Sequence, residues 1–267
     1  MFYNAKNGMI KIDDVEMDYI SFGSGNRNVI LIPGLGDGLR TVKGIALPFA
    51  FMYREYVKEY KVYVFSRKKQ LEEGYTTRDM ARDMKIAMEK VGIDKADIVG
   101  VSQGGMIAQY IAIDYPEVVN KLVLAVTVPK TNEIIENVVG TWMEWAKQGR
   151  YKDIQIDTAE KMYSEAYLRK NRWMYPILGS VGKPKDFSRF LIMANACLTH
   201  NAYDELYKIK MPCMVIGATL DKVVGGEASK QIASKISGSQ LYMYSEYGHG
   251  VFEEAKDFNQ RIKEFLG

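Results

Sequence analysis

The chain has 267 residues and a mass of 30.4 kDa, which fits either two small domains or one large α/β domain with an insertion. Hydrophobic residues make up 47% and charged residues 26% of the chain, a balance that excludes disordered, collagen-like and coiled-coil proteins. The formal net charge of +3 is too small to indicate a nucleic-acid-binding protein or a polybasic membrane anchor.

Cys197 and Cys213 lack the spacing of a zinc site or a disulfide framework, so we expect reduced, partly buried thiols and no bound metal. The N-terminal residues do not have the pattern of a signal peptide. No apolar run approaches the ~20 residues of a membrane span. We therefore expect a soluble, cytoplasmic monomer or homodimer that binds neither nucleic acid nor membrane.

The first elements are three β-like runs at 9–13, 16–22 and 28–32, with turn residues between them. Their connections are too short for crossover helices, which predicts an antiparallel meander. A glycine-rich loop from Pro33 to Gly38 follows the third run, and then a possible helix precedes a strand at 61–66.

Beyond this strand, β-like runs alternate with helical patterns, which predicts a mainly parallel sheet covered by helices. Thr76 is a suitable N-cap for a helix that Gly92 would end. The other expected elements are strands at 96–101, 121–127, 212–217 and 240–244, a helix at 103–115 before Pro116, and a final helix at 255–266.

Between residues 129 and 200 the strand signal disappears and three amphipathic stretches follow, which predicts a helical insertion. All three tryptophans, Trp142, Trp145 and Trp173, lie in it. Aromatic residues at such positions either bury the insertion against the main domain or line an apolar substrate pocket beneath a lid.

Residues 100–104 have the pattern Gly-X-Ser-X-Gly, with Ser102 at its centre. An apolar strand directly precedes this motif and a buried-helix pattern directly follows it, as a nucleophile elbow requires. Gly100 and Gly104 have a steric purpose there, because a tight elbow leaves no room for a Cβ at either position. The motif therefore predicts that the Ser102 hydroxyl projects into a cleft.

A serine hydroxyl needs a base at neutral pH, and the chain has only two histidines. His249 lies in a small-residue loop after the last strand and is the preferred base, whereas His200 is expected on the surface or in the lid. Asp221 follows the strand at 212–217 and is the preferred partner for His249. Other aspartates fit less well, namely Asp97, Asp114 and Asp204.

Acyl transfer also needs donors for the developing oxyanion, and backbone amides at helix starts are suitable. The amide of Gln103 follows the nucleophile, and Leu35 can present a second amide from the glycine-rich loop. That loop lacks the Lys-Ser/Thr of a P-loop and the Gly-X-Gly-X-X-Gly spacing, which disfavours nucleotide binding.

With the elbow, the Pro-Gly-Leu-Gly loop and the order Ser102, Asp221, His249, the chain resembles the α/β-hydrolase superfamily in its lid-bearing serine hydrolase branch. The resemblance implies an α/β fold with an eight-stranded, mostly parallel sheet, helices on both faces and a helical cap after the sixth strand. Residues 1–128 and 201–267 would form the core, and 129–200 the cap. It also implies a catalytic triad of Ser102, Asp221 and His249, with Leu35 and Gln103 forming the oxyanion hole.

Many members of this superfamily carry an Asp-X-X-Gly-X-Gly-X-Ser loop after the fourth strand, which this chain replaces with a segment containing Arg67, Lys68 and Lys69. These residues and Arg40 could favour an anionic substrate, but such a charge run is more often solvated surface. We expect the substrate pocket to include Gly34 and the three tryptophans.

The leading hypothesis is a serine esterase without a cofactor, which hydrolyses a small carboxylic ester, thioester or lactone through an acyl-enzyme. The same triad also serves carbon–carbon bond hydrolysis, aminopeptidase action and perhydrolysis in this superfamily. A non-catalytic ligand receptor on the same fold is the alternative of a different class.

Overall fold

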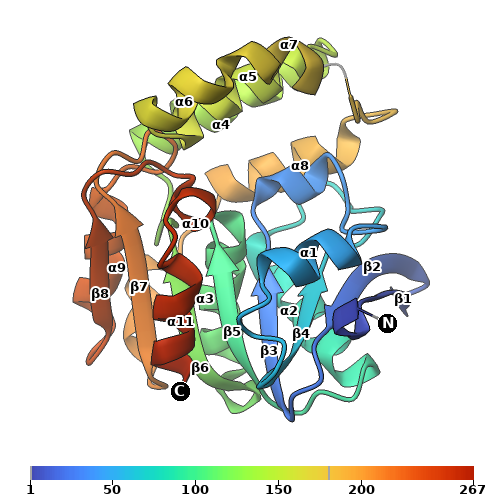
Figure 1. Ribbon diagram of the computed structural model, residues 1–267, viewed down its shortest axis with the longest axis vertical. Coiled ribbons are helices and arrows are strands. Elements are labelled where there is room, and N and C mark those ends of the chain that lie inside the picture. Colours follow the sequence, from blue (N-terminus) through green and yellow to red (C-terminus); the bar gives the residue numbers. More distant parts are fainter. Residues whose placement is uncertain (1, 180) are drawn as a thin grey trace.

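The computed structural model describes residues 2–179 and 181–267. Within this part of the chain, eight strands form one sheet in the order β1-β2-β4-β3-β5-β6-β7-β8 (Figure 1). The strands are β1 (Lys6–Ile12), β2 (Val15–Phe22), β3 (Arg27–Ile32), β4 (Tyr60–Phe65), β5 (Ala96–Val101), β6 (Val119–Ala125), β7 (Cys213–Ala218) and β8 (Gln240–Tyr244). From β4 to β8 all neighbouring strands are parallel, whereas β2 is antiparallel to both β1 and β4.

The predicted three-stranded meander is wrong in its third member, because β4 lies between β2 and β3. The link between β2 and β3 crosses the start of β4, and the two backbones lie in close contact there. A Cβ at Gly25 would lie 2.0 Å from the carbonyl oxygen of Glu59. The glycine-rich link thus passes over a strand that lies far away in the sequence, which local turn patterns do not reveal.

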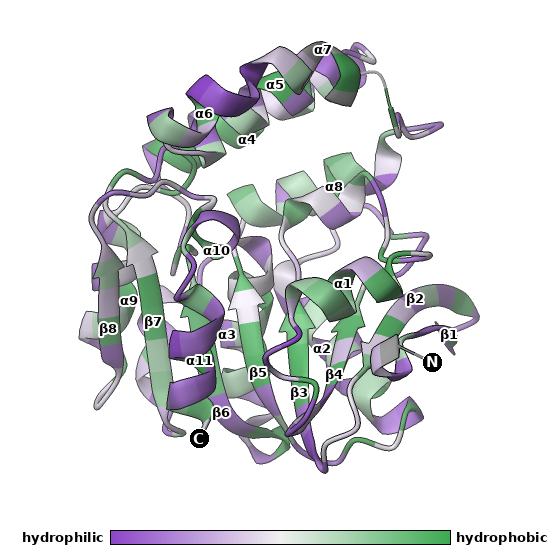
Figure 2. Ribbon diagram, viewed as in Figure 1, coloured by the Kyte–Doolittle hydropathy of each residue, from purple (hydrophilic) through white to green (hydrophobic). Residues whose placement is uncertain are grey.

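Helices cover both faces of the sheet. One face carries α1 (Ala46–Met52), α10 (Val251–Glu254) and α11 (Phe258–Leu266), and the other carries α2 (Thr77–Lys90), α3 (Gln103–Asp114) and α9 (Glu227–Lys235). Each face buries its own hydrophobic cluster, and Figure 2 shows the central strands β3, β5 and β7 mainly in the green of hydrophobic residues. The sheet is therefore buried on both sides, as parallel sheets require.

Local signals explain how several of these elements begin and end. The Thr76 side chain accepts a hydrogen bond from the Asp79 amide, and the Asp79 carboxylate accepts one from the Thr76 amide, which forms the capping box of α2. The predicted final helix begins later than expected, because Ala255 has an extended conformation and separates α10 from α11. The loop after β8 therefore ends in a short helical turn close to His249.

The insertion after β6 is helical, as predicted. It consists of α4 (Glu133–Lys147), α5 (Tyr151–Met162), α6 (Glu165–Asn171), α7 (Tyr175–Leu178) and α8 (Ser188–Leu198). Helices α4 to α7 form a layer above the carboxyl ends of the strands, and α8 lies lower, against the core (Figure 1). None of the described helices is long and apolar enough to cross a membrane.

Candidate active site

Ser102 occupies the sharp turn between β5 and α3. Its backbone has φ 54° and ψ −124°, a conformation that costs a non-glycine residue about 1–3 kcal/mol. Two hydrogen bonds hold this turn: the Ser102 amide donates to Ala125 at 2.9 Å, and the buried Thr127 hydroxyl donates to the Ser102 carbonyl at 2.7 Å. The end of β6 therefore supports the strained residue.

The glycines on either side of Ser102 are required by close backbone approaches. A Cβ at Gly104 would lie 1.9 Å from the carbonyl oxygen of Ile32, and a Cβ at Gly100 would lie 2.4 Å from that of Gly104. Neither contact can be relieved by a side-chain movement, because the opposing atoms are backbone. The steric explanation proposed for the Gly-X-Ser-X-Gly motif is therefore consistent with the geometry.

His249 and Asp221 form a buried pair. Nδ1 of His249 lies 2.8 Å from Oδ2 of Asp221. The other carboxylate oxygen, Oδ1, accepts hydrogen bonds from the amides of Val223 and Val224 at 2.8 and 2.9 Å. Both oxygens of the Asp221 carboxylate therefore have hydrogen-bond partners. Because Nδ1 of His249 is engaged with Asp221, Nε2 is the ring nitrogen available on the side of the cavity that His249 and Ser102 both line.

Leu35 and Gln103 both begin helices beside Ser102. Leu35 is the first residue of a 3₁₀-helix, Leu35–Gly38, and Gln103 is the first residue of α3, so neither amide has a partner inside its own helix. A Cβ at Gly34 would lie 3.2 Å from the Cβ of Ser102, which shows how closely this loop approaches the elbow. Two helix starts therefore converge on Ser102, a favourable place for negative charge.

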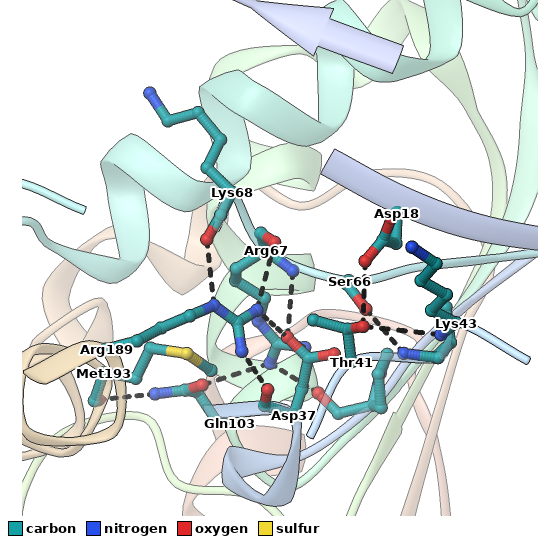
Figure 3. Close-up of polar contacts among 12 residues, drawn as sticks. Asp18, Asp37, Thr41, Lys43, Ser66, Arg67, Lys68, Gln103, Arg189 and Met193 are labelled. Atoms are coloured by element: carbon teal, nitrogen blue, oxygen red, sulfur yellow. Dashed lines mark hydrogen bonds and ion pairs between the residues drawn. The ribbon is translucent and has the colours of Figure 1, made fainter. Parts of the chain in front are cut away.

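One guanidinium connects these two segments. Arg67, which is only 1% exposed, donates through Nη2 to the Pro33 carbonyl and to Oε1 of Gln103, the latter at 3.1 Å (Figure 3). The Gln103 side chain in turn donates to the Met193 carbonyl at 2.6 Å and to Cys197 Sγ at 3.0 Å. Arg67 thus bridges the glycine-rich loop and the start of α3.

Asp37 and Arg189 complete this buried network. Oδ2 of Asp37 accepts from the Arg67 amide at 2.9 Å and from Nη2 of Arg189 at 2.5 Å, and Nε of Arg189 donates to the Lys68 carbonyl at 2.9 Å (Figure 3). Burial lowers the pKa of Arg67 to about 10, although the nearby Asp37 charge opposes this shift. Arg67 is therefore still protonated at neutral pH.

The expectation that residues 67–69 form a solvated charge run is wrong. Arg67 and Lys68 are buried, and Lys68 pairs with Asp83 at 3.5 Å while lying over the Tyr75 ring. Lys69 is half-buried and pairs with Glu16 at 2.6 Å. The role of Arg67 could not be predicted from the sequence, because its partners, the Pro33 carbonyl and Oε1 of Gln103, lie far from it along the chain.

A cavity of about 570 Å³ opens beside Ser102 and His249, within the size range of small-molecule sites. Gly34, Leu35, Arg40 and Trp142 also line it. The other two tryptophans of the predicted pocket are not among its lining residues: Arg150 lies over the Trp145 ring, and Trp173 is 71% exposed. Trp173 lies in the short 3₁₀ turn Arg172–Met174, where its ring meets solvent.

The remaining candidates lie away from this cavity. Asp97 is the second residue of β5 and pairs with Arg27, Asp114 pairs with Arg78, and Asp204 is exposed. Cys197 and Cys213 are free and fully buried rather than partly buried, and burial raises the pKa of each thiol to about 12. The expected pair of His249 and Asp221 is present, and His249 lines the same cavity as Ser102.

His200 is buried, contrary to the expectation of a surface or lid residue. It is 2% exposed, and its Nδ1 lies 2.9 Å from the Thr77 hydroxyl, while its ring lies edge-on to Tyr110. Burial lowers the pKa of His200 to about 3. The residue therefore stays neutral in the folded protein over most of the pH range.

This burial predicts a specific pH dependence of stability. Between pH 4 and 6 the unfolded chain carries one more proton at His200 than the folded chain, so the free energy of unfolding should rise with pH. We expect this slope to exceed that of His200→Gln by about 1.4 kcal/mol per pH unit. Urea unfolding at pH 4, 5 and 6 measures both slopes, and equal slopes would contradict the buried neutral imidazole.

The cap is fastened to the segment that follows His249. The Gly250 amide donates to the Met162 carbonyl at 2.7 Å, and the Ser164 amide and hydroxyl donate to the Glu254 carboxylate at 2.9 and 2.6 Å. The Tyr163 hydroxyl also bonds the Glu253 carboxylate. We call these contacts the α5–α6 clasp, since they hold the junction between the two cap helices against α10.

Comparison with known protein families finds one whose model matches most of this chain. A family model described as alpha/beta hydrolase fold matches residues 28–256. A 2-hydroxy-6-oxononadienedioate/2-hydroxy-6-oxononatrienedioate hydrolase from a Pseudomonas species is 26% identical over 70% of this chain and 68% of its own length.

Solved structures agree on the fold. MGS-M2, an alpha/beta hydrolase enzyme from a Medee basin deep-sea metagenome library, superposes with a TM-score of 0.86 at 23% identity, covering 97% of each chain. The enol-lactonase from Burkholderia xenovorans LB400 superposes with a TM-score of 0.82 at 17% identity, covering 97% of this chain and 99% of its own.

Proposed function

Because this chain belongs to the alpha/beta hydrolase fold family, we propose that it is a serine hydrolase that cleaves a carboxylic ester, thioester or lactone. The observation that carries this proposal is the Asp221–His249 pair, whose imidazole lines one cavity with the strained Ser102. A base oriented by a carboxylate next to a serine on an elbow is the arrangement that activates a hydroxyl.

The proposed reaction has two halves. Ser102 Oγ attacks the acyl carbon and gives its proton to His249 Nε2, while the amides of Leu35 and Gln103 donate hydrogen bonds to the oxyanion that forms. His249 then returns the proton to the leaving alcohol or thiol, which leaves an acyl-Ser102 ester. Water attacks this ester with His249 as base, the acid is released and Ser102 recovers its proton.

Labelling with a fluorophosphonate tests the nucleophile directly. We expect one adduct per chain by intact mass, located on Ser102 by peptide sequencing, because the reagent phosphonylates an activated serine. Ser102→Ala should remain unlabelled, and Thr141→Ala, which removes an exposed hydroxyl on α4, should be labelled like the wild type. A folded wild type that takes no label would contradict the proposal and favour a non-catalytic ligand receptor.

A second candidate is hydrolysis of a carbon–carbon bond next to a ketone. The curated relative from Pseudomonas is named for such 2-hydroxy-6-oxo dienedioate substrates, and the same triad could attack a ketone carbon. Loss of the absorbance of a 2-hydroxy-6-oxo-dienoate would support this candidate. Turnover of simple esters and lactones without turnover of the dienoate would favour the ester or lactone hydrolase.

A further inference from the structure

The cavity continues past Ser102 and His249 onto the face of the sheet that carries α1 and α11. Figure 1 shows these two helices on one face with β3 and β5 between them. The lining residues of this part come from three strands, from α1 and the segment after it, and from α11: they are Leu31, Phe49, Met52, Tyr53, Tyr56, Val64, Val99, Val101, Phe258, Asn259 and Ile262. We call this part of the cavity the α1–α11 groove.

The α1–α11 groove differs chemically from the rest of the cavity. All of its lining residues are uncharged, and Asn259 is its one amide, whereas Asp37, Arg40 and Glu253 line the cavity elsewhere. Aliphatic side chains of the strands form the floor, and aromatic rings of the two helical segments form the walls. Such a surface favours an apolar group and disfavours a charged one.

The two helical walls of the groove are joined at one point, and exposed apolar side chains border it elsewhere. The Tyr56 hydroxyl donates to the Asn259 carbonyl at 3.1 Å and so joins the segment after α1 to α11. Elsewhere, Met52 lines the groove and is 47% exposed, and its helix neighbours Leu47 and Phe51 are 52% and 63% exposed. Apolar side chains therefore border the groove where it meets solvent.

Its length suits an extended alkyl chain. Val99 precedes Ser102 by three residues on β5, so the floor reaches roughly 10 Å below the proposed nucleophile at the usual rise of a strand. An extended alkyl chain advances roughly 1.3 Å per carbon–carbon bond of ~1.5 Å. The groove could thus hold an acyl chain of about eight carbons that starts at Ser102.

We propose that the α1–α11 groove is the acyl-chain subsite, which makes straight-chain, medium-length acyl esters or thioesters the preferred substrate class. The proposal rests on the proposed function, because the subsite is defined relative to the ester bond at Ser102. The groove is continuous with the cavity that holds Ser102 and His249. The alcohol or thiol side then lies under the cap, beside polar residues such as Gln155 and Thr158.

The test uses p-nitrophenyl esters from acetate to decanoate. For the wild type we expect kcat/KM to rise about three- to four-fold with each added methylene, and to level off near octanoate, where the groove ends. In Asn259→Phe the added ring fills part of the groove beside Tyr56, while the Asn259 carbonyl that Tyr56 contacts is retained. The ratio of octanoate to acetate kcat/KM should fall at least ten-fold in this variant.

Thr158→Phe is the matched control, since it adds the same ring to the cap side of the same cavity. We expect its octanoate to acetate ratio to stay within two-fold of the wild type. If only Thr158→Phe lowers this ratio, or if the wild type shows no chain-length dependence, the proposal is wrong. Asn259→Leu provides a smaller plug in case the phenylalanine variant does not fold.

Failure of the subsite and failure of the catalytic proposal give different results. A protein that takes the fluorophosphonate at Ser102 and hydrolyses acetate without chain-length dependence retains the proposed function and loses the subsite. If no ester is hydrolysed, octanoic acid should still raise the melting temperature of the wild type and not of Asn259→Phe. Equal shifts in both proteins would overturn the subsite independently of any activity.

Discussion

Replacing Asp221 with Asn is expected to lower kcat about 10⁴-fold, the loss known for this change in serine triads. The Oδ1 of the new side chain can still accept from the amides of Val223 and Val224, so the loop keeps its two backbone hydrogen bonds. Its amide group then faces Nδ1 of His249 as a donor. This favours the tautomer with the proton on Nε2, which cannot accept the Ser102 proton.

Turnover of p-nitrophenyl acetate measures this loss, and thermal unfolding shows whether the variant is folded. Asp204→Asn is the matched control, because Asp204 is an exposed aspartate after the cap. We expect the control to have wild-type kcat. If Asp221→Asn retained more than a tenth of the wild-type kcat while folded, Asp221 could not be the group that orients the base.

Arg67→Met is expected to lower both activity and stability. The substitution leaves the Pro33 carbonyl and Oε1 of Gln103 without their buried donor, and it removes one cation from Asp37. Breaking a buried ion pair on one side costs about 3–5 kcal/mol of unfolding free energy. We also expect kcat to fall by about 10- to 100-fold with a nearly unchanged KM, because misplaced oxyanion donors act in the transition state.

Two neighbouring variants separate geometry from charge. Lys68→Met removes a buried cation that pairs with Asp83 and whose side chain points away from the network in Figure 3, so it should lower stability and leave kcat largely intact. Arg67→Lys keeps the charge but not the planar fork, and we expect it to remain impaired in kcat. Full recovery in Arg67→Lys would show that charge alone matters there.

The elements with strong local signals could be predicted from the sequence. The capping residue Thr76 marks the start of α2, and the apolar strand before Ser102 together with the glycines after it predicts the elbow. The histidine and aspartate of the pair could be selected because each follows a strand whose carboxyl end lies at the same edge of the sheet. These features depend on neighbours a few residues away.

The features that could not be predicted depend on contacts between distant segments. β4 lies between β2 and β3 because of strand pairing across the sheet. The short link between β2 and β3, taken alone, is equally consistent with a hairpin. The burial of Arg67 depends on carbonyls of Pro33 and of residues far along the chain. The α1–α11 groove could not be predicted either, because the spacing between these two helices depends on the tertiary fold and not on the sequence of either helix.

The α5–α6 clasp couples the position of the cap to the position of the proposed base, His249. Gly250 bonds Met162 directly after His249, and Glu254 bonds Ser164 one helical turn further on. If the α5–α6 junction moved away from α10, these contacts would displace the loop that carries the His249 imidazole. The position of the base therefore depends on the position of this part of the cap. Substrate and product are therefore expected to pass at the opposite margin of the cap, where Tyr175 of α7 and Met52 of α1 line the cavity, while the clasp stays in place.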